Sequence, residues 1–358
     1  MTRQRAIPCS VMRGGTSKGL YFLADDLPAN AAERDRILLA AMGSPDAREI
    51  DGMGGGHPLT SKVAVVRSSE RDEADVEYLF LQVVPDQPIV SDQQNCGNIL
   101  AGVAPFAIEQ GLVEAADGET TVRVYMVNSD SLAEVIVQTP GGDVTYTGEA
   151  EIDGVPGSHA PIRQFFVDTA GANCGALLPT GNAVDEIDGV NCTLIDNGMP
   201  VVVMAAEALG LAGDESAEDF DESALRARCE RIRLEAGRRM NLGDVSEATV
   251  PKLTFVSAPK SGGMIATRTL IPHTLHSSIG VLGAVSVASA CLLPGTPAHH
   301  WASIPPGARK ACSLEHPTGA LMVEAEVTET DQGVELGRMG ILRTARLLMT
   351  GSVHVPAL

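Results

Sequence analysis

The sequence predicts an α+β protein that consists of two similar domains. Three observations lead to this prediction: the length of 358 residues, the hydrophobic content of 44%, and an order of strands and helices that occurs twice along the chain. At roughly 150 residues per domain, this length corresponds to two domains. The hydrophobic content is sufficient for each domain to bury a core of its own.

The first half begins with a short apolar strand, a glycine-rich turn and a second strand. A helix is predicted over residues 31–42, because apolar side chains recur there at helical spacing. Two strands follow over 62–66 and 76–84. An apolar helix then begins at the segment Asn95-Cys96-Gly97-Asn98 and ends before Gly111.

The second half shows the same order of elements. It contains two short strands around a turn, a helix over 223–238, a hairpin over 252–270, and a second apolar helix that opens near Ser277. Equivalent elements are about 180–190 residues apart, although few residues are identical between the halves. We therefore expect an internal structural repeat, and the alternative is a pair of unrelated α/β domains.

The domain boundaries follow from this repeat. We expect the first domain to span residues 1–185, with a return of the chain at about 340–358, and the second to span 186–339. The segment 154–182 is rich in Gly, Pro and Ala, which is typical of a region between domains.

The charge and composition exclude several classes of partner. A net charge of −20 disfavours binding to nucleic acid and to anionic membranes, so an anionic ligand requires a locally positive site. The longest apolar run, 279–293, is shorter than the roughly 20 residues of a membrane span, and no signal peptide is visible. The seven cysteines are odd in number and form no CxxC pair, which indicates a reduced, cytoplasmic protein.

Cys96 is the first candidate for chemistry. It precedes an apolar helix whose positive end favours a thiolate, and Gly97 lets a ligand approach the backbone closely. Asn98 is a plausible N-cap of the helix, and we expect Asn95 and Asn98 to contact a bound ligand. The alternative is a buried cysteine that packs as a small hydrophobe, against which the polar neighbours argue.

Lys62 is the second candidate. It lies at the start of a β-branched strand, where partial desolvation disfavours the ammonium form and lets the neutral amine act as a general base. The alternative is an ordinary strand-edge lysine that discourages aggregation. The residues alone leave both interpretations open.

Arg13 begins a glycine-rich turn that extends to Gly19. The order of residues is wrong for a nucleotide-binding P-loop. We interpret the turn, with Arg13, Thr16 and Ser17, as a nest of backbone N–H groups that binds a carboxylate. The alternative is a tight hairpin turn.

The start of the second apolar helix offers further candidates. Ser277 and Ser278 occupy the place that Cys96 and Gly97 hold in the first half, and with Gly280 they can present hydroxyl and N–H groups to an anion; the alternative is that the serines are only helix caps. Arg268 could pair with a carboxylate, or could be an ordinary surface residue of a strand.

Metals and cofactors are not expected. His273 and His276 lack an obvious third metal ligand, and the glycine fingerprint of dinucleotide-binding proteins is missing. An aromatic content of 3% argues against a stacking platform for nucleic acid.

Six collinear motifs resemble those of the PrpF-like isomerases across nearly the whole chain. They are residues 12–19 (MRGGTSKG), 50–62 (IDGMGG followed by LTSK), 95–99 (NCGNI), 178–182 (LPTGN), 196–200 (DNGMP) and 343–346 (RTAR). The resemblance implies the diaminopimelate epimerase-like fold, with two pseudo-symmetric domains that each wrap a mixed β-sheet or barrel around a central helix.

Two further motifs, residues 241–245 (NLGDV) and 279–286 (IGVLGAVS), look closest to the 4-oxalomesaconate tautomerases and isomerases of this family. The resemblance implies a cofactor-independent isomerase that moves a proton on a small polycarboxylate in the breakdown of gallate and protocatechuate. Lys62 looks like the base and Cys96 like its partner. The serines at 277–278 disfavour a two-cysteine epimerase. The oligomeric state is left open, and a homodimer is compatible with the sequence.

Two segments depart from that branch. It usually shows MENTG where this chain has residues 126–130 (MVNSD), and IPHR where it has residues 271–274 (IPHT). These departures leave open 2-methylaconitate cis-trans isomerisation, another polycarboxylate as substrate, or a non-catalytic carboxylate-binding protein. Keto–enol tautomerisation and 1,3-allylic isomerisation also both remain open.

Overall fold

The computed structural model describes residues 4–216, 218, 220, 223–330 and 333–357. The chain divides into two compact units, Met1–Val167 with Leu342–Leu358, and Asp168–Ile341. The first division thus falls before the expected position at 185–186. The reason is that the segment after residue 168 is bound to Asp196, whose carboxylate accepts the backbone N–H groups of Asn173 and Cys174 at 2.7 and 2.8 Å.

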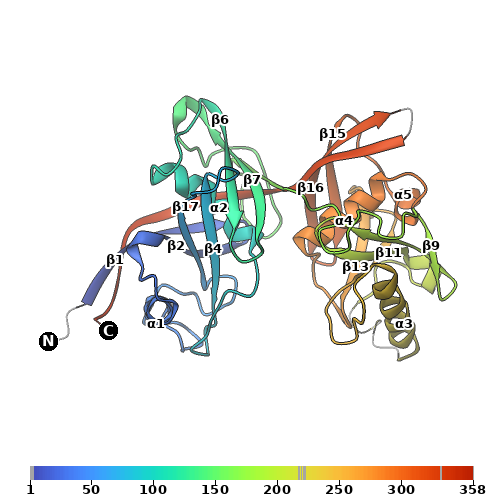
Figure 1. Ribbon diagram of the computed structural model, residues 1–358, viewed down its shortest axis with the longest axis horizontal. Coiled ribbons are helices and arrows are strands. Elements are labelled where there is room, and N and C mark those ends of the chain that lie inside the picture. The colour runs from blue at the N-terminus through green and yellow to red at the C-terminus, as the bar shows by residue number, and fades with distance from the viewer. Residues whose placement is uncertain (1–3, 217, 219, 221–222, 331–332, 358) are drawn as a thin grey trace. The chain divides into compact units, whose positions relative to one another are not determined.

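The first unit is built on a mixed sheet (Figure 1). In the order of pairing, its strands are the second part of β17 (Gly333–Pro356), β1 (Gln4–Gly14), β2 (Ser17–Leu23), β3 (Lys62–Ser68), β4 (Val76–Val83), β6 (Gly118–Met126), β7 (Ser131–Thr139) and β8 (Pro161–Phe166), with β5 (Val90–Ser91) on β4. The pairs β2–β3 and β4–β6 are parallel, and the other pairs are antiparallel.

Helix α2 (Gly97–Glu109) is the central element of this unit. Every residue from Ile99 to Ala107 is buried, as expected of a helix that is apolar on all sides. The helix contacts strands from both halves of the sheet, from β1 to β8. The strands therefore wrap around α2, and they fix the position of its N-terminus.

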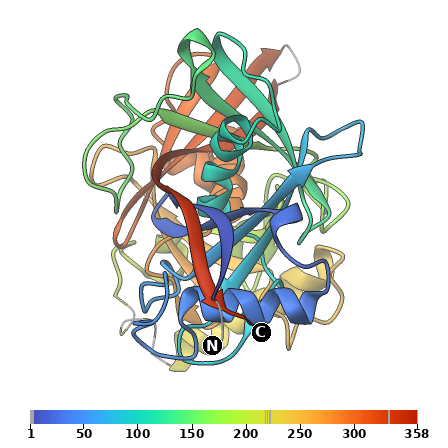
Figure 2. The ribbon, with the colours of Figure 1, turned by 90° about the vertical axis from the view of Figure 1, so that its left-hand side faces the viewer.

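Helix α1 (Ala31–Met42) covers the opposite face of β1, β2 and β3. Its boundaries follow from local chemistry: Asn30 accepts the backbone N–H of Glu33 at 3.1 Å, and Gly43 ends the helix at a φ of 83°. Figure 2 shows α1, in blue, and α2, in teal, on opposite sides of these strands. Two 3-10 turns, η1 (Ala24–Asp26) and η2 (Pro140–Gly142), complete the unit.

The second unit repeats this topology. Its strands pair in the order β9 (Asp185–Ile187), β10 (Val190–Asp196), β11 (Pro200–Ala205), β12 (Lys252–Ser257), β13 (Ile265–Ile271), β15 (Arg309–His316), β16 (Gly319–Thr330) and the first part of β17, with β14 (Thr274–Leu275) on β13. The pairs β11–β12 and β13–β15 are parallel, as β2–β3 and β4–β6 are. The predicted repeat is thus confirmed by strand order and direction.

The helices of the second unit occupy corresponding places. Helix α4 (Val281–Leu292) is buried from Gly283 onward, and α3 (Ser223–Arg239) packs on the outer face of the sheet. The remaining elements are η3 (Ala206–Leu209) and α5 (Pro297–Trp301).

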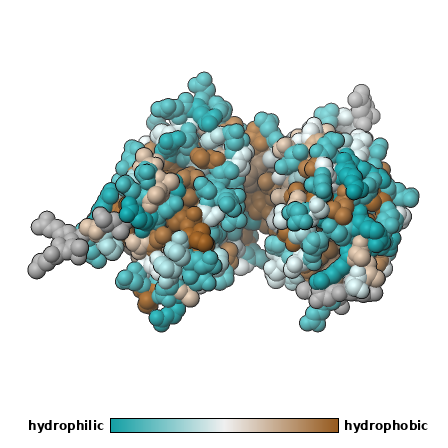
Figure 3. All heavy atoms as spheres, turned by 60° about the horizontal axis from the view of Figure 1, so that its bottom comes forward, coloured by the Kyte–Doolittle hydropathy of each residue, from teal (hydrophilic) through white to brown (hydrophobic). Residues whose placement is uncertain are grey.

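The face drawn in Figure 3 is mostly hydrophilic, with some patches of hydrophobic residues. Within the described part of the chain, no helix combines the length and the apolar character needed to cross a membrane.

Candidate active site

The glycine-rich turn is a two-residue hairpin and not an open nest of N–H groups. Gly14 pairs with Ser17, so that only Gly15 and Thr16 form the turn. The N–H of Gly15 donates to Thr344 O at 2.8 Å and that of Lys18 to Leu59 O at 2.9 Å. The turn is therefore the tight hairpin that was the alternative, because β17 and the loop before β3 already use these two donors. Carboxylate binding by Arg13, Thr16 and Ser17 stays a prediction.

The hairpin instead packs against the first turn of α2. A Cβ added to Gly14 would lie 2.3 Å from Asn98 O, and one added to Gly15 would lie 2.3 Å from Asn98 Oδ1. Only glycine permits this approach. The hairpin tip is consequently in direct contact with the first turn of α2.

Asn98 joins these elements through its side chain. Its Nδ2 donates to Thr16 Oγ1 at 3.0 Å and to Ser17 Oγ at 3.4 Å, while its Oδ1 accepts Arg343 Nε at 3.1 Å. The expected capping role of Asn98 is wrong. The N-cap is Cys96, and the hairpin and β17 occupy the Asn98 amide.

Cys96 lies at the N-cap of α2 and makes no side-chain capping bond. Its carbonyl accepts the N–H of Leu100 at 2.9 Å and the Tyr78 hydroxyl at 3.3 Å. These bonds fix the backbone and leave the thiol uncommitted. The thiol therefore stands at the positive end of a buried helix.

Arg343 is a candidate that the sequence analysis missed. Its side chain is 8% exposed, and burial lowers the pKa of its guanidinium to about 10, opposed by the negative charge of a Cys96 thiolate. The guanidinium is thus a cation near the thiol. The sequence did contain a signal for Arg343, the motif at 343–346, but no function was assigned to the residues of that motif.

Lys62 is buried at the start of β3, with 6% of its surface exposed. Its Nζ donates to Gln82 Oε1 at 2.6 Å and lies 5.1 Å from the centroid of the Phe80 ring. The Gln82 amide is held in turn by the carbonyls of Pro58, Ser61 and Val83 at 3.0–3.1 Å. Across the described residues, no carboxylate forms an ion pair with Lys62.

Glu49 holds the loop that precedes Lys62. This buried carboxylate accepts the hydroxyl of Ser61 and the N–H of Gly56, the latter at 2.7 Å. A Cβ on Gly54 would lie 2.2 Å from the Glu49 carboxylate. Gly54 of the motif at 50–55 is thus explained by the packing of the loop around a buried acid.

Asn95 contacts the segment that departs from the family pattern. Its Nδ2 donates to Ser129 Oγ. The same segment is fixed by Asn128, which accepts the N–H of Phe80 at 2.8 Å and donates to Phe80 O at 2.9 Å. The departure at 126–130 therefore lies beside the residue that precedes Cys96.

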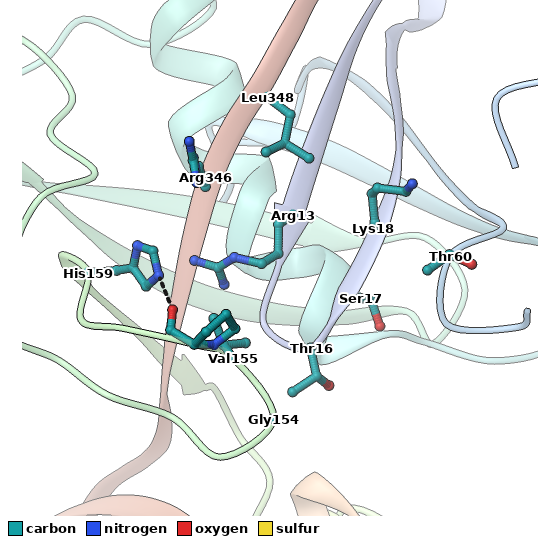
Figure 4. Close-up of a pocket in the computed structure, with 11 residues that line it drawn as sticks. Arg13, Thr16, Ser17, Lys18, Thr60, Gly154, Val155, His159, Arg346 and Leu348 are labelled. Atoms are coloured by element: carbon teal, nitrogen blue, oxygen red, sulfur yellow. Dashed lines mark hydrogen bonds between the residues drawn. The ribbon is translucent and has the colours of Figure 1, made fainter. Parts of the chain in front are cut away.

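Lys62 and Cys96 belong to the same side of the sheet of the first unit. Side chains alternate along a strand, and Lys62 shares its face with Ala64 and Val66, which pack in the core around α2 together with Cys96. Arg13 is different. Its neighbours Met12 and Gly14 face α2, so that Arg13 points to the other side, where it lines a pocket of about 270 Å³ (Figure 4).

In the second unit, the serines at 277–278 are not helix caps. The cap of α4 is Gly280, and a Cβ added there would meet no atom within 4 Å. Ser278 donates its N–H to His276 Nδ1 at 2.9 Å, and its Oγ lies 3.1 Å from His316 Nε2. His316 was not predicted, because it is far from Ser278 in the sequence. Substrate contacts by Ser277, Ser278 and Gly280 stay predictions.

Arg268 is turned away from α4. It shares a face of β13 with Leu270, which packs on the side of α3, and it donates to the carbonyls of Glu215 at 3.0 Å and Thr267 at 2.9 Å. We therefore leave Arg268 out of the candidate site. Where the structure describes the chain, three or more His, Cys, Asp or Glu side chains nowhere gather into a metal site.

Comparison with known proteins decides the family. The family model described as PrpF protein matches residues 4–356. The chain belongs to the PrpF family. The (4E)-oxalomesaconate Delta-isomerase of Novosphingobium sp. (strain KA1) is 59% identical to it over 97% of each chain. The 4-oxalomesaconate tautomerase of Pseudomonas putida is 56% identical over 98% of this chain and 97% of the relative.

Solved structures agree with this assignment to the PrpF family. The crystal structure of methylitaconate-delta-isomerase has a TM-score of 0.87 at 33% identity and covers 99% of this chain and 96% of that chain. A hydroxyproline epimerase from Agrobacterium vitis has a TM-score of 0.52 at 14% identity, covering 99% and 94%, which shows a shared fold. The predicted family, isomerase class and diaminopimelate epimerase-like fold are confirmed.

The cysteines of this PrpF-family chain should differ sharply in reactivity. Six are buried and only Cys96 is partly exposed. Burial raises the pKa of Cys229 to about 11 and those of Cys174, Cys192 and Cys312 to about 12. Because the thiolate is the reactive form, we expect iodoacetamide at pH 8 to modify one thiol in the native protein and seven after unfolding, as counted by mass spectrometry.

Two variants test this expectation. Cys96→Ser should abolish native labelling, whereas Cys9→Ser, which removes a buried thiol of β1, should leave one label. Native labelling that persists in Cys96→Ser would contradict the expected accessibility of Cys96.

Proposed function

We propose that the chain is a cofactor-independent isomerase of 4-oxalomesaconate. In the proposed reaction, the neutral amine of Lys62 takes a proton from a carbon α or allylic to a carbonyl or carboxylate group. The C–H electrons move into a dienolate. A proton is then returned at another atom, so that the reaction neither consumes nor releases any group. The names of the two relatives that are more than half identical support this substrate.

The environment of Lys62 is the observation that carries the proposal. A general base must be held in a fixed position close to the proton that it removes. The Lys62 Nζ is held by its hydrogen bond to the Gln82 amide oxygen at 2.6 Å and by its contact with the Phe80 ring. The amide, which is itself fixed by three carbonyls, positions the amine.

The N-terminus of α2 supplies the second part of the proposal. An oxyanion that develops in the reaction is stabilised by N–H groups and cations positioned in advance. Arg343 and the positive end of α2 provide such groups beside Cys96, with Asn95, Asn98, Thr16 and Ser17 as candidate contacts for the substrate. Lys62 or the Cys96 thiol returns the proton. Because Arg13 points to the other side of the sheet, we do not place it at the reacting atoms.

Proton NMR in D₂O tests the proposed reaction directly. Purified protein is incubated with 4-oxalomesaconate and, in parallel, with 2-methylaconitate and trans-aconitate. We expect isomerisation of 4-oxalomesaconate alone, with deuterium entering at the carbon that receives the proton. The signal that exchanges also distinguishes the two reactions. Keto–enol tautomerisation moves the proton between the α carbon and the carbonyl oxygen, so it exchanges only the α carbon, whereas 1,3-allylic isomerisation places deuterium on the carbon at the other end of the allylic unit.

The other outcomes each point elsewhere. Turnover of 2-methylaconitate or trans-aconitate instead would replace the proposed substrate. Binding of all three acids without exchange would indicate a carboxylate-binding protein. The Lys62→Met variant is the control that measures non-enzymatic exchange of the substrate protons.

A further inference from the structure

Arg13 has no part in the proposed reaction, and the pocket that it lines shares only Thr16 and Ser17 with the candidate substrate contacts. The pocket lies in the first unit, under the segment Gly154–His159, and its wall includes Lys18, Thr60 and Arg346 (Figure 4). A volume of about 270 Å³ is slightly below the range of roughly 300–1,000 Å³ that takes drug-sized ligands. The pocket is therefore of a size that suits a small ligand.

The wall of this pocket is strongly cationic. Arg13 pairs across the sheet with Lys18 on β2 and with Arg346 on β17, so that three positive side chains form one row on one face. None of the eleven lining residues is acidic. Within the part of the chain that the structure describes, these three cations form no ion pair. In a protein with a net charge of −20, such a row is unusual.

The three cations of the row repel one another, and a bound anion would reduce this repulsion. Burial lowers the pKa of the Arg13 guanidinium, and the nearby charge of Arg346 lowers it further. Arg13 Nη1 is used by Gly15 O at 2.9 Å and by Thr344 O and Oγ1 at 3.0 and 2.9 Å, while its Nη2 has no hydrogen-bond partner. The repulsion between the cations is relieved by a bound oxyanion, whereas Nη2 itself is buried and is not a contact atom for the ion.

The cationic row lies on the opposite face of the sheet from Lys62. Lys62 pairs with Gly19 on β2, and Gly19 points to the opposite face from its neighbour Lys18 because side chains alternate along a strand. Lys62 is also not among the residues that line the pocket. One sheet thus carries the proposed base on one side and the cationic row on the other.

We infer that this pocket is a second binding site, for a small multivalent oxyanion such as a polycarboxylate or phosphate. The guanidinium of Arg346 and the ammonium of Lys18 bind the oxygens, and Arg13 supplies charge beneath them. The hairpin that carries Arg13 and Lys18 also carries Ser17, which Asn98 contacts from the other side. Occupancy of the pocket therefore stiffens the hairpin tip that packs on the N-terminus of α2.

Isothermal titration calorimetry with citrate and with inorganic phosphate tests the inference. Arg346→Gln and Lys18→Gln should each weaken binding of the preferred ion by about tenfold or more, because each removes a charge-assisted hydrogen bond to the ion. Arg5→Gln is the matched control, because it removes the same charge from an exposed position of β1 and should leave binding unchanged. The tighter of the two ions identifies the class of ligand.

Two results would overturn the inference. One is equal affinity of the parent protein and both pocket variants, or no binding of either ion. The other is loss of binding in Lys62→Met, which would place the ion at the proposed reaction site. If Lys62→Met loses turnover but still binds the ion, the result supports a separate site. The inference and the proposed function can therefore fail independently. Thermal melting curves verify that each variant is folded.

Discussion

Lys62→Met should reduce kcat/KM for the true substrate by about 10²–10⁴-fold, the usual contribution of a general base. Methionine keeps the length and the apolar stem of the side chain but cannot take a proton. The change leaves the Gln82 carbonyl oxygen without its 2.6 Å donor, which should cost about 1–3 kcal/mol of stability. Steady-state kinetics and thermal melting curves separate the two effects.

Lys252→Met is the matched control for this substitution. Lys252 begins β12 and pairs with Val201 of the parallel strand β11, just as Lys62 begins β3 and pairs with Gly19 of β2. It is therefore the counterpart of Lys62 in the repeat, and we place no chemistry on it. Turnover should survive in Lys252→Met. If Lys62→Met retained full activity, the assignment of the base would be wrong.

Gly14→Ala should have the second largest effect. The new methyl group would lie 2.3 Å from Asn98 O and 3.0 Å from the Tyr21 hydroxyl, and the first of these is a backbone atom that cannot rotate away. The first turn of α2 must shift, and Cys96 shifts with it. A misplacement of about 1 Å can cost about 10²-fold in rate, and overpacking costs roughly 1–3 kcal/mol of stability.

Gly351→Ala provides the comparison for this variant. Gly351 lies on β17 and pairs with Cys9 of β1, but its added methyl group would meet nothing closer than 3.9 Å. We expect kcat/KM and the melting temperature of Gly351→Ala to stay near those of the parent protein. A Gly14→Ala enzyme with unchanged kinetics would show that the N-terminus of α2 need not be held in place.

Elements with local signals were predicted well. Helix α1 has the expected bounds, because its N-cap, its apolar spacing and its terminal glycine all lie within one short segment. The order of strands and helices in both halves was also visible in the pattern of apolar residues. The direction of pairing within each unit could not be read from that pattern, since it depends on partners that are distant in the sequence.

The errors at the site have a common physical cause. The turn at Gly15 is a closed hairpin and not an open nest, because the Gly15 N–H donates to Thr344 O on the distant strand β17. Asn98 is not a cap because Arg343, Thr16 and Ser17 compete for its amide. Each of these competitors is brought in by the pairing of β17 with β1 or by the β1–β2 hairpin. A prediction that treats each helix terminus by itself cannot include them.

The pairing of β1 with β17 also has a consequence for the order in which the chain can fold. Gln4 pairs with Pro356, and residues 342–358 complete the first unit, although residues 168–341 separate them from the rest of it. During synthesis, the second unit emerges completely while β1 still lacks one partner. Nascent chains generally fold from the N-terminus, but here the N-terminal unit is the last to be finished. Arg343 arrives with this last part of β17, so the proposed site becomes complete only after residues 168–341 have been synthesised.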